Sequence, residues 1–116
     1  HAVCDALLGA MNEGDLGQYY PSSDLNFKDM GSLKMLKEVS GKLSNRGFRL
    51  VNLDAVIIAQ TPRLETFLKD MRKRLAEALV VPPDLVSVKV KSSDHIGSIG
   101  RMEGIAAQAI CLIETA

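Results

Sequence analysis

The 116-residue chain contains no tryptophan, and its only aromatic residues are two tyrosines and three phenylalanines. Surfaces that bind single-stranded nucleic acid usually stack the bases on several aromatic side chains, so this composition argues against such a surface. The 14 basic residues are balanced by 14 acidic residues, which leaves a formal net charge of zero. The chain therefore has neither the general positive field that attracts nucleic acid nor an acidic tail.

Cysteines and long apolar runs are also scarce. Cys4 and Cys111 are far apart in the sequence and do not form the closely spaced pair of a metal site, so we expect free, buried thiols. No apolar run approaches the ~20 residues that cross a bilayer. The first residue is not methionine, and we expect the natural N-terminus to lie upstream of it. The length suits one compact domain with a substantial core.

Hydrophobic periodicity predicts the order helix, helix, strand, helix, strand, strand. We expect helices at residues 1–12, 33–46 and 62–81, and strands at residues 48–60, 86–91 and 104–113. Ser32 is expected to cap the second helix, and Thr61-Pro62 to begin the third. The polar segment 14–31 has the length of a functional or mobile loop. Both faces of the second half of strand 48–60 are apolar, which predicts cover on both sides.

This order predicts an α+β fold, a two-layer α/β sandwich with the helices packed on one face of a mixed β-sheet. The strand after the third helix is expected to return beside its predecessor, as in split βαβ folds. There are no repeats, linkers or low-complexity tracts. We therefore expect residues 1–116 to form a single domain.

Two stretches in the first half of the chain could carry chemistry. His1 heads the first helix, and Cys4 lies one turn further along, so the two could face one metal ion. Zinc sites need three or four ligands, however, and a lone histidine is more often structural. Asp15 lies between two glycines, where it could accept hydrogen bonds from the hydroxyls of a polyol or satisfy its own turn.

Two further stretches follow predicted strands. Residues 59–62 join the end of a strand to the start of a helix, a position at which α/β proteins bind ligands and anions. Residues 91–94 follow the next strand, with Arg101 nearby. Their two hydroxyls, ammonium group and carboxylate suit a phosphate together with a divalent cation. Residues 59–62 and 91–94 could also be ordinary polar loops between secondary-structure elements.

Seven motifs recur in a recognisable order: His1-Ala-Val-Cys-Asp-Ala-Leu-Leu-Gly-Ala10, Gly14-Asp-Leu-Gly17, Asp24-Leu-Asn-Phe-Lys28, Asn52-Leu-Asp54, Ile57-Ile-Ala-Gln60 followed by Pro62, Val88-Lys89, and Gly100-Arg-Met-Glu-Gly-Ile-Ala106. In this order and spacing they resemble the 2-C-methyl-D-erythritol 2,4-cyclodiphosphate synthase family of the non-mevalonate isoprenoid pathway. The resemblance extends over nearly the whole chain.

The resemblance implies an enzyme, a phosphorus–oxygen lyase. In this family the 2-phosphate of 4-diphosphocytidyl-2-C-methyl-D-erythritol 2-phosphate attacks the β-phosphate, the 2,4-cyclodiphosphate forms and CMP leaves. Because the substrate supplies both reacting groups, catalysis consists of positioning and charge neutralisation. The resemblance further implies a homotrimer with active sites between subunits, in a bacterial cytoplasm or plastid stroma, without nucleic-acid or membrane partners.

The resemblance also implies metals and site residues. A Zn²⁺ and a Mg²⁺ or Mn²⁺ are expected beside the diphosphate. His1 matches one zinc ligand; the other two belong to an upstream Asp-x-His motif, so we expect the family's N-terminal segment to be missing here. Asp94 matches the acidic Mg²⁺ ligand, and Ser92 the catalytic hydroxyl that stabilises the transition state. The matched substrate-binding positions are Asp15, Leu16 and Gly17 for the methylerythritol, Tyr20 and Asp24 in the loop that follows, Ala59, Gln60, Thr61, Pro62, Arg63, Leu64 and Glu65 for the cytosine, Lys91, Ser93 and Asp94 for the diphosphate, and Arg101 at the trimer axis.

The chain departs from the family pattern in the phosphate loop, where Lys91-Ser-Ser-Asp94 replaces Thr-Thr-Thr-Glu. Serine keeps the hydroxyl, but aspartate shortens the reach of the carboxylate by one methylene. Ser98 stands where an aromatic residue is usual near the axial cavity. Two alternatives therefore stay open: a non-catalytic trimeric module that binds a nucleotide or an isoprenoid phosphate, and an inactive truncated core of the enzyme.

Overall fold

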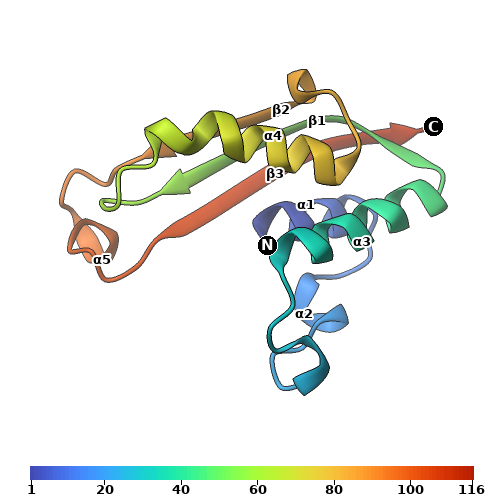
Figure 1. The fold of residues 1–116 in the computed structure, drawn as a ribbon, viewed down its shortest axis with the longest axis horizontal. Coiled ribbons are helices and arrows are strands. Elements are labelled where there is room, and N and C mark those ends of the chain that lie inside the picture. The colour runs from blue at the N-terminus through green and yellow to red at the C-terminus, as the bar shows by residue number, and fades with distance from the viewer.

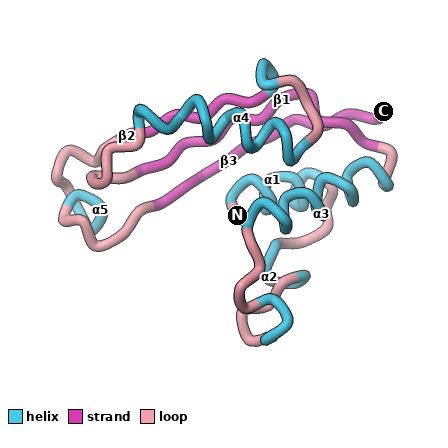
Figure 2. Tube along the Cα trace, viewed as in Figure 1, coloured by secondary structure: helices cyan, strands magenta, loops and turns pink.

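The sheet confirms the α+β class. The computed structural model describes all of residues 1–116 (Figures 1 and 2). Strands β1 (Phe48–Ile58), β2 (Val86–Lys91) and β3 (Ala106–Thr115) form one sheet in the order β2-β1-β3. β1 pairs parallel with β2 and antiparallel with β3, so the sheet is mixed, as predicted. Helix α4 (Leu68–Leu79) joins the parallel pair, which is the expected crossover connection.

Three helices cover one face of this sheet. α1 (Ala2–Ala10) lies against β3, α4 lies against β2, and α3 (Ser32–Asn45) packs against both helices (Figure 1). Their apolar faces meet the inward-facing side chains of the sheet in a single core. Both cysteines are free, as predicted. The most deeply buried side chains are those of Cys4, Leu7, Leu8 and Leu53.

The structure corrects how two helices begin. Ser32 does not cap α3, because it is already the first helical residue; the extended backbone that precedes the helix belongs to Gly31. Thr61-Pro62 does not begin a helix either. The peptide bond between them is cis, and a 3₁₀ turn (Glu65–Phe67) comes before α4. The Ala59 N–H still donates a hydrogen bond to the neighbouring strand, so the chain is still part of the sheet at this point. The residues that follow are needed to connect the sheet to the helix layer, and the helix begins only after them.

The segment between α1 and α3 projects from the body of the molecule (Figure 1). It is not one loop but a chain of tight turns, α2 (Leu16–Tyr19) and a 3₁₀ turn (Leu25–Phe27). At its start Gly14 has a φ of +82°, and the side chain of Gln18 fills the space that a β-carbon would need. The positive φ favours glycine here, whereas the end of the Gln18 side chain could move aside.

The face of the sheet opposite the helices carries apolar side chains that nothing in this chain covers. Side chains alternate along a strand, and since Cys111 points into the core, Ile110 and Leu112 point away from it. Ile110 is 72% exposed and Leu112 is 56% exposed. The second half of β1 is only half-buried, so the predicted cover on both sides is not met within one chain. An exposed apolar patch of this kind is typical of an interaction surface.

The two remaining features are the last helix of the chain, which has four residues, and the absence of a membrane-spanning helix. α5 (Gly97–Gly100) interrupts the loop between β2 and β3, which sequence periodicity did not predict. Among all the helices, none combines the length and the apolar character that crossing a bilayer would require.

Candidate functional site

The segments predicted to hold the cytosine and the diphosphate lie side by side. Because β1 and β2 are parallel, the chain leaves both strands at the same edge of the sheet. The Ala59 N–H donates to the Lys91 carbonyl at 2.9 Å and extends the ladder by one bond. Just beyond, the His95 N–H donates to Gln60 Oε1 at 2.9 Å. Open α/β sheets bind ligands at this edge, outside the carboxyl ends of their strands.

The predicted phosphate loop is a compact turn with exposed polar groups. The Ser92 hydroxyl donates to Asp94 Oδ1 at 3.3 Å, and the Asp94 N–H donates to Ser92 Oγ at 3.3 Å. Asp94 and His95 both have positive φ angles, 52° and 63°. The α5 residue Gly100 lies so close beneath that a β-carbon there would meet the His95 carbonyl carbon at 2.2 Å. The loop is thus held from below while Ser92 and Asp94 stay exposed.

Asp15, the predicted polyol ligand, stands at the N-cap of α2. Its Oδ1 accepts the Gln18 N–H at 3.1 Å, so the ordinary role of satisfying its own turn is present. The other carboxylate oxygen accepts no hydrogen bond, and the residue is exposed. The adjacent Leu16 N–H donates to Asp5 Oδ1 at 2.7 Å, which ties the turn to α1. The turn is therefore ordered and still has one free acceptor.

His1, the predicted zinc ligand, is exposed before α1 with its Nε2 3.0 Å from the Ser32 hydroxyl. The pairing of His1 with Cys4 around one ion is wrong, because Cys4 is only 1% exposed and belongs to the core. Burial raises the pKa of the Cys4 thiol. No three His, Cys, Asp or Glu side chains gather in a way that could hold a metal. Zinc needs at least three ligands, so the residues of one chain do not complete a zinc site.

Asp94 fits a magnesium ion better than His1 fits zinc. Mg²⁺ keeps several waters and is usually bound by one or two carboxylates together with substrate phosphates. One exposed carboxylate beside a phosphate-compatible loop meets that requirement without further protein ligands.

An apolar cavity of about 320 Å³ opens between the N-terminal end of α1, α4 and the sheet. Its walls include Leu33, Ile57, Met71, Leu75 and Val88, with His1 at one side. Periodicity predicts Met71 and Leu75 as core residues of α4, yet both are only half-buried. The helix packs tightly only near its C-terminal end, at Ala76, Ala78 and Leu79.

Comparisons with known proteins decide the family. A model described as the YgbB family matches residues 1–114. The chain belongs to the YgbB family. It is 47% identical over 116 residues to the 2-C-methyl-D-erythritol 2,4-cyclodiphosphate synthase of Syntrophomonas wolfei, matching 100% of this chain and 74% of that protein. The synthase of the same name from Chlorobium phaeovibrioides shows the same identity and the same shares.

Solved structures agree with this family. The bifunctional IspDF from Campylobacter jejuni has a TM-score of 0.96 at 34% identity; the match covers 100% of this chain and 31% of that one. IspF from Plasmodium falciparum in complex with CDP has a TM-score of 0.87 at 25% identity, covering 99% of this chain and 69% of that one. The predicted α+β fold is therefore a fold found in solved structures of this family.

In this YgbB-family chain, Tyr20 and Asp24 belong to the projecting segment. The Tyr20 hydroxyl donates to the Glu38 carboxylate of α3, and its ring packs edge-on against Phe27 with 5.3 Å between centroids. Burial, followed by the bond to Glu38, raises the pKa of Tyr20 to about 12. Asp24 accepts the Asn26 N–H at 2.9 Å and caps the 3₁₀ turn. Tyr20 thus anchors this segment on α3.

The other predicted positions are placed as follows. Residues 61–65 are exposed except for the half-buried Leu64; the carbonyls of Leu64 and Glu65 accept hydrogen bonds from the 3₁₀ turn that follows. Arg101 follows α5 and forms an ion pair with Glu103, with 2.5 Å between Nε and Oε2. Within one chain, the turn carrying Asp15 is well separated from the strand-end loops and α5, which lie at another end of the molecule (Figure 1).

Two structural contacts of this YgbB-family chain have no signal in the sequence. The hydrogen bond from the His95 N–H to Gln60 occurs at a turn in which two successive residues, Asp94 and His95, have a left-handed backbone conformation. The contact between Glu13 and Arg46 joins the turn after α1 to the residue that follows α3, 33 positions further along the chain. Neither residue type nor spacing predicts such meetings.

Proposed function

We propose that this chain converts 4-diphosphocytidyl-2-C-methyl-D-erythritol 2-phosphate to 2-C-methyl-D-erythritol 2,4-cyclodiphosphate with release of CMP. The observation that carries the proposal is the family match over residues 1–114, joined with relatives 47% identical that are named for this product. The chain is accordingly assigned as a lyase of isoprenoid biosynthesis. The single core supports our view that residues 1–116 act as one domain, and the bacterial relatives favour the bacterial over the plastid location.

The diphosphate end of the substrate is proposed to bind the turn after β2. The Ser92 hydroxyl would donate to a phosphoryl oxygen as negative charge develops on it, exchanging its present contact with Asp94. Lys91 adds a positive charge at the end of the strand. Asp94 would hold a Mg²⁺ or Mn²⁺, which when bound neutralises the charge of the diphosphate. No protein nucleophile is required, because the substrate contains both reacting phosphates.

The nucleotide end is proposed to bind residues 59–65. Thr61, Pro62 and Arg63 are exposed, so their backbone can meet the edge of a cytosine, and the segment is held beside the phosphate loop by the Gln60–His95 hydrogen bond. Two of the structural neighbours are described as complexes with CDP, which supports a cytidine nucleotide as the ligand here. Base and diphosphate would then be recognised by adjacent segments of one chain.

The polyol end is proposed to bind Asp15 from another copy of the chain. The single-turn helix α2, which Asp15 caps, and α5, which follows the loop that contains Ser92, lie at different ends of the molecule (Figure 1). The uncovered face of the sheet supplies a surface for self-association, with Ile110 and Leu112 exposed on it. Asp54 and Lys89 form an ion pair with 2.6 Å between Oδ2 and Nζ on the same face, and Lys89 lowers the pKa of the Asp54 carboxyl. We propose that three copies associate through this face.

The function is tested by incubating the protein with the diphosphocytidyl substrate, Zn²⁺ and Mg²⁺. We expect release of CMP together with formation of the cyclic diphosphate, resolved by chromatography and ³¹P NMR. Binding of CDP without CMP release would instead support the non-catalytic module. The absence of both would support an inactive core. His1 would contribute one imidazole to zinc; within one copy no two further His, Cys, Asp or Glu side chains gather with it.

The self-association surface predicts the effect of Ile110→Glu. Introducing a charge into an apolar interface is expected to convert the trimer to monomers and to abolish CMP release, because each active site would lose the partner's polyol turn. Light scattering after gel filtration measures the change in mass. Val80→Glu is the control, since Val80 is 87% exposed after α4 and away from the sheet face. An Ile110→Glu protein that stays trimeric contradicts this surface.

A further inference from the structure

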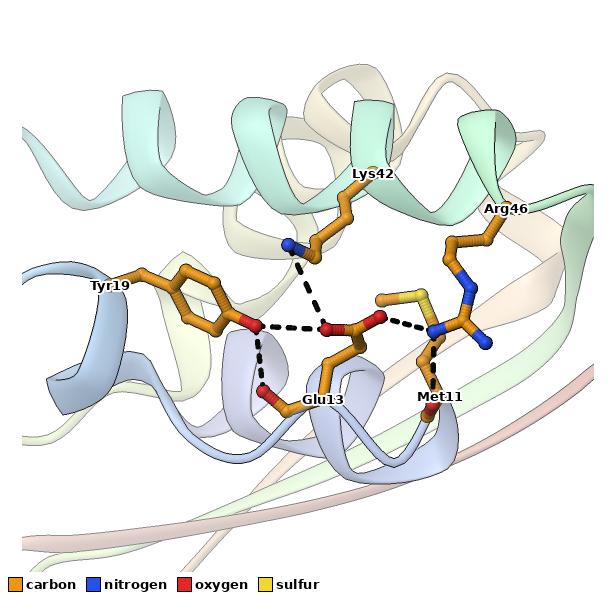
Figure 3. Close-up of polar contacts among 5 residues, drawn as sticks. All are labelled: Met11, Glu13, Tyr19, Lys42 and Arg46. Carbon is orange, nitrogen blue, oxygen red and sulfur yellow. Dashed lines mark hydrogen bonds and ion pairs between the residues drawn. The ribbon is translucent and has the colours of Figure 1, made fainter.

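A cluster of five residues joins the turn after α1 to α3 (Figure 3). At its centre is Glu13. The Tyr19 hydroxyl lies 2.9 Å from the Glu13 carbonyl oxygen and 3.0 Å from its Oε2. Arg46 donates to Glu13 Oε1 and, at 3.2 Å, to the Met11 carbonyl. Lys42 places its ammonium group 3.8 Å from Glu13 Oε2 and 4.3 Å from the centre of the Tyr19 ring.

The Glu13 carboxylate is suited to accept these hydrogen bonds and ion pairs in its ionised form. Its side chain is 24% exposed, and its pKa is lowered first by the hydrogen bond from Tyr19 and then by Arg46 and Lys42. The carboxylate is therefore ionised at neutral pH and accepts from three directions at once. Charge-assisted hydrogen bonds of this kind are stronger than neutral ones. Figure 3 shows the cations reaching Glu13 from α3 and Tyr19 reaching it from α2.

The position of this cluster relative to Asp15 gives it a role beyond stability. Glu13 and Tyr19 immediately bracket residues 14–18, so their contact closes both ends of a five-residue segment. Within that segment Asp15 caps α2, which is a single turn. The only other hydrogen bond that ties residues 14–18 to the body is from Leu16 N–H to Asp5. Fixing Tyr19 against Glu13 consequently fixes the direction in which Asp15 points.

We propose that Glu13, through Tyr19, is a positioning residue for the polyol end of the substrate. This inference rests on the proposed function, in which Asp15 accepts hydrogen bonds from the methylerythritol hydroxyls. Neither Glu13 nor Tyr19 touches the substrate. Together they hold the Asp15 turn against α3, whose residues Lys42 and Arg46 supply the charges that keep the carboxylate in place.

The test separates the polyol end of the substrate from its nucleotide end. Tyr19→Phe removes only the hydroxyl, and Glu13→Gln removes the charge while keeping the shape. In either variant we expect KM for the diphosphocytidyl substrate to rise about fivefold to tenfold, the loss expected for one weakened hydrogen bond. The Kd for CDP, which lacks the methylerythritol, is expected to stay within about twofold of the original value, because the base and diphosphate are proposed to bind other segments.

Two comparisons make this test specific. In the double variant Tyr19→Phe/Glu13→Gln, KM is expected to rise by less than the product of the two single effects, since both substitutions remove the contact between the Tyr19 hydroxyl and Glu13 Oε2. Asp84→Asn is the control: it breaks the Arg72–Asp84 ion pair (3.4 Å) between α4 and the turn before β2, far from residues 14–18, and should leave KM unchanged. Circular dichroism melting confirms that each variant is folded.

The outcomes distinguish the inference from the function on which it rests. An unchanged KM in both single variants, an equal loss of CDP affinity, or additive effects in the double variant overturns the positioning role alone. If the original protein neither releases CMP nor binds CDP, the proposed function fails, and the positioning role fails with it.

Discussion

Replacing Ser92 with alanine is expected to lower kcat for CMP release by about 10²- to 10³-fold, the usual effect of removing one donor that stabilises a developing oxyanion. In the structure the Ser92 hydroxyl is exposed and bound only within its own loop, to Asp94. It can therefore turn to a phosphoryl oxygen without breaking a core contact. The Kd for CDP should change much less than kcat, because the hydroxyl is proposed to act mainly in the transition state.

Two controls accompany Ser92→Ala. Ser92→Thr keeps the hydroxyl and restores the residue of the family pattern, so it should retain most of the activity. Ser98→Ala removes another exposed hydroxyl from the same loop, on α5, and should leave kcat close to the original value. A Ser92→Ala enzyme with full kcat would contradict the catalytic assignment, and a loss of kcat and CDP affinity in equal measure would mean that the loop only binds.

The second large effect is expected in the core. Leu7 is completely buried in α1, where the helix packs against β3 and α3. Leu7→Ala is expected to lower the free energy of unfolding by about 2–5 kcal/mol, the sum of lost apolar burial and the cavity left behind. Urea denaturation followed by circular dichroism measures the change. A loss of less than about 1 kcal/mol would show that the α1–sheet interface can collapse around the smaller side chain.

The same substitution on the projecting segment is a matched control for Leu7→Ala. Leu25 begins the 3₁₀ turn and is 82% exposed. Leu25→Ala is therefore expected to change the free energy of unfolding by no more than about 0.5 kcal/mol. The contrast between two identical substitutions isolates the contribution of burial.

Much of the fold could be predicted because the signals are local. The periodicity of 3.6 in residues 1–12 and 33–46 gives two helices at nearly the observed positions, and Gly47, with a φ of +78°, ends the second one as expected. Alternation of valine with serine and lysine predicts β2 correctly. The predicted helix start at Thr61-Pro62 was wrong because it does not depend on local sequence alone. It also depends on how many residues the chain needs to pass from the sheet to the helix layer.

The candidate site divides in the same way. The sequence predicts which residues could hold a phosphate, a metal or a polyol (residues 91–94, His1 and Asp15), because the functional group of a side chain follows from its residue type. The sequence does not predict which other residues these side chains contact in the folded protein. The predicted burial of the Cys4 thiol is confirmed, but Ser32 faces His1 instead of capping its helix. That contact follows from how α1 and α3 pack, which no short pattern encodes.

By itself, the sequence determined the class of this protein: an α+β domain with the ordered motifs of the cyclodiphosphate synthase family, because hydrophobic period and motif spacing are properties of the chain alone. Only the tertiary structure decided which groups meet. It joined Gln60 to His95, placed Glu13 between Tyr19 and Arg46, and left Ile110 uncovered. Gln60 and His95 are 35 positions apart in the chain and Glu13 and Arg46 are 33 apart, so tertiary packing and not local sequence brings each pair together.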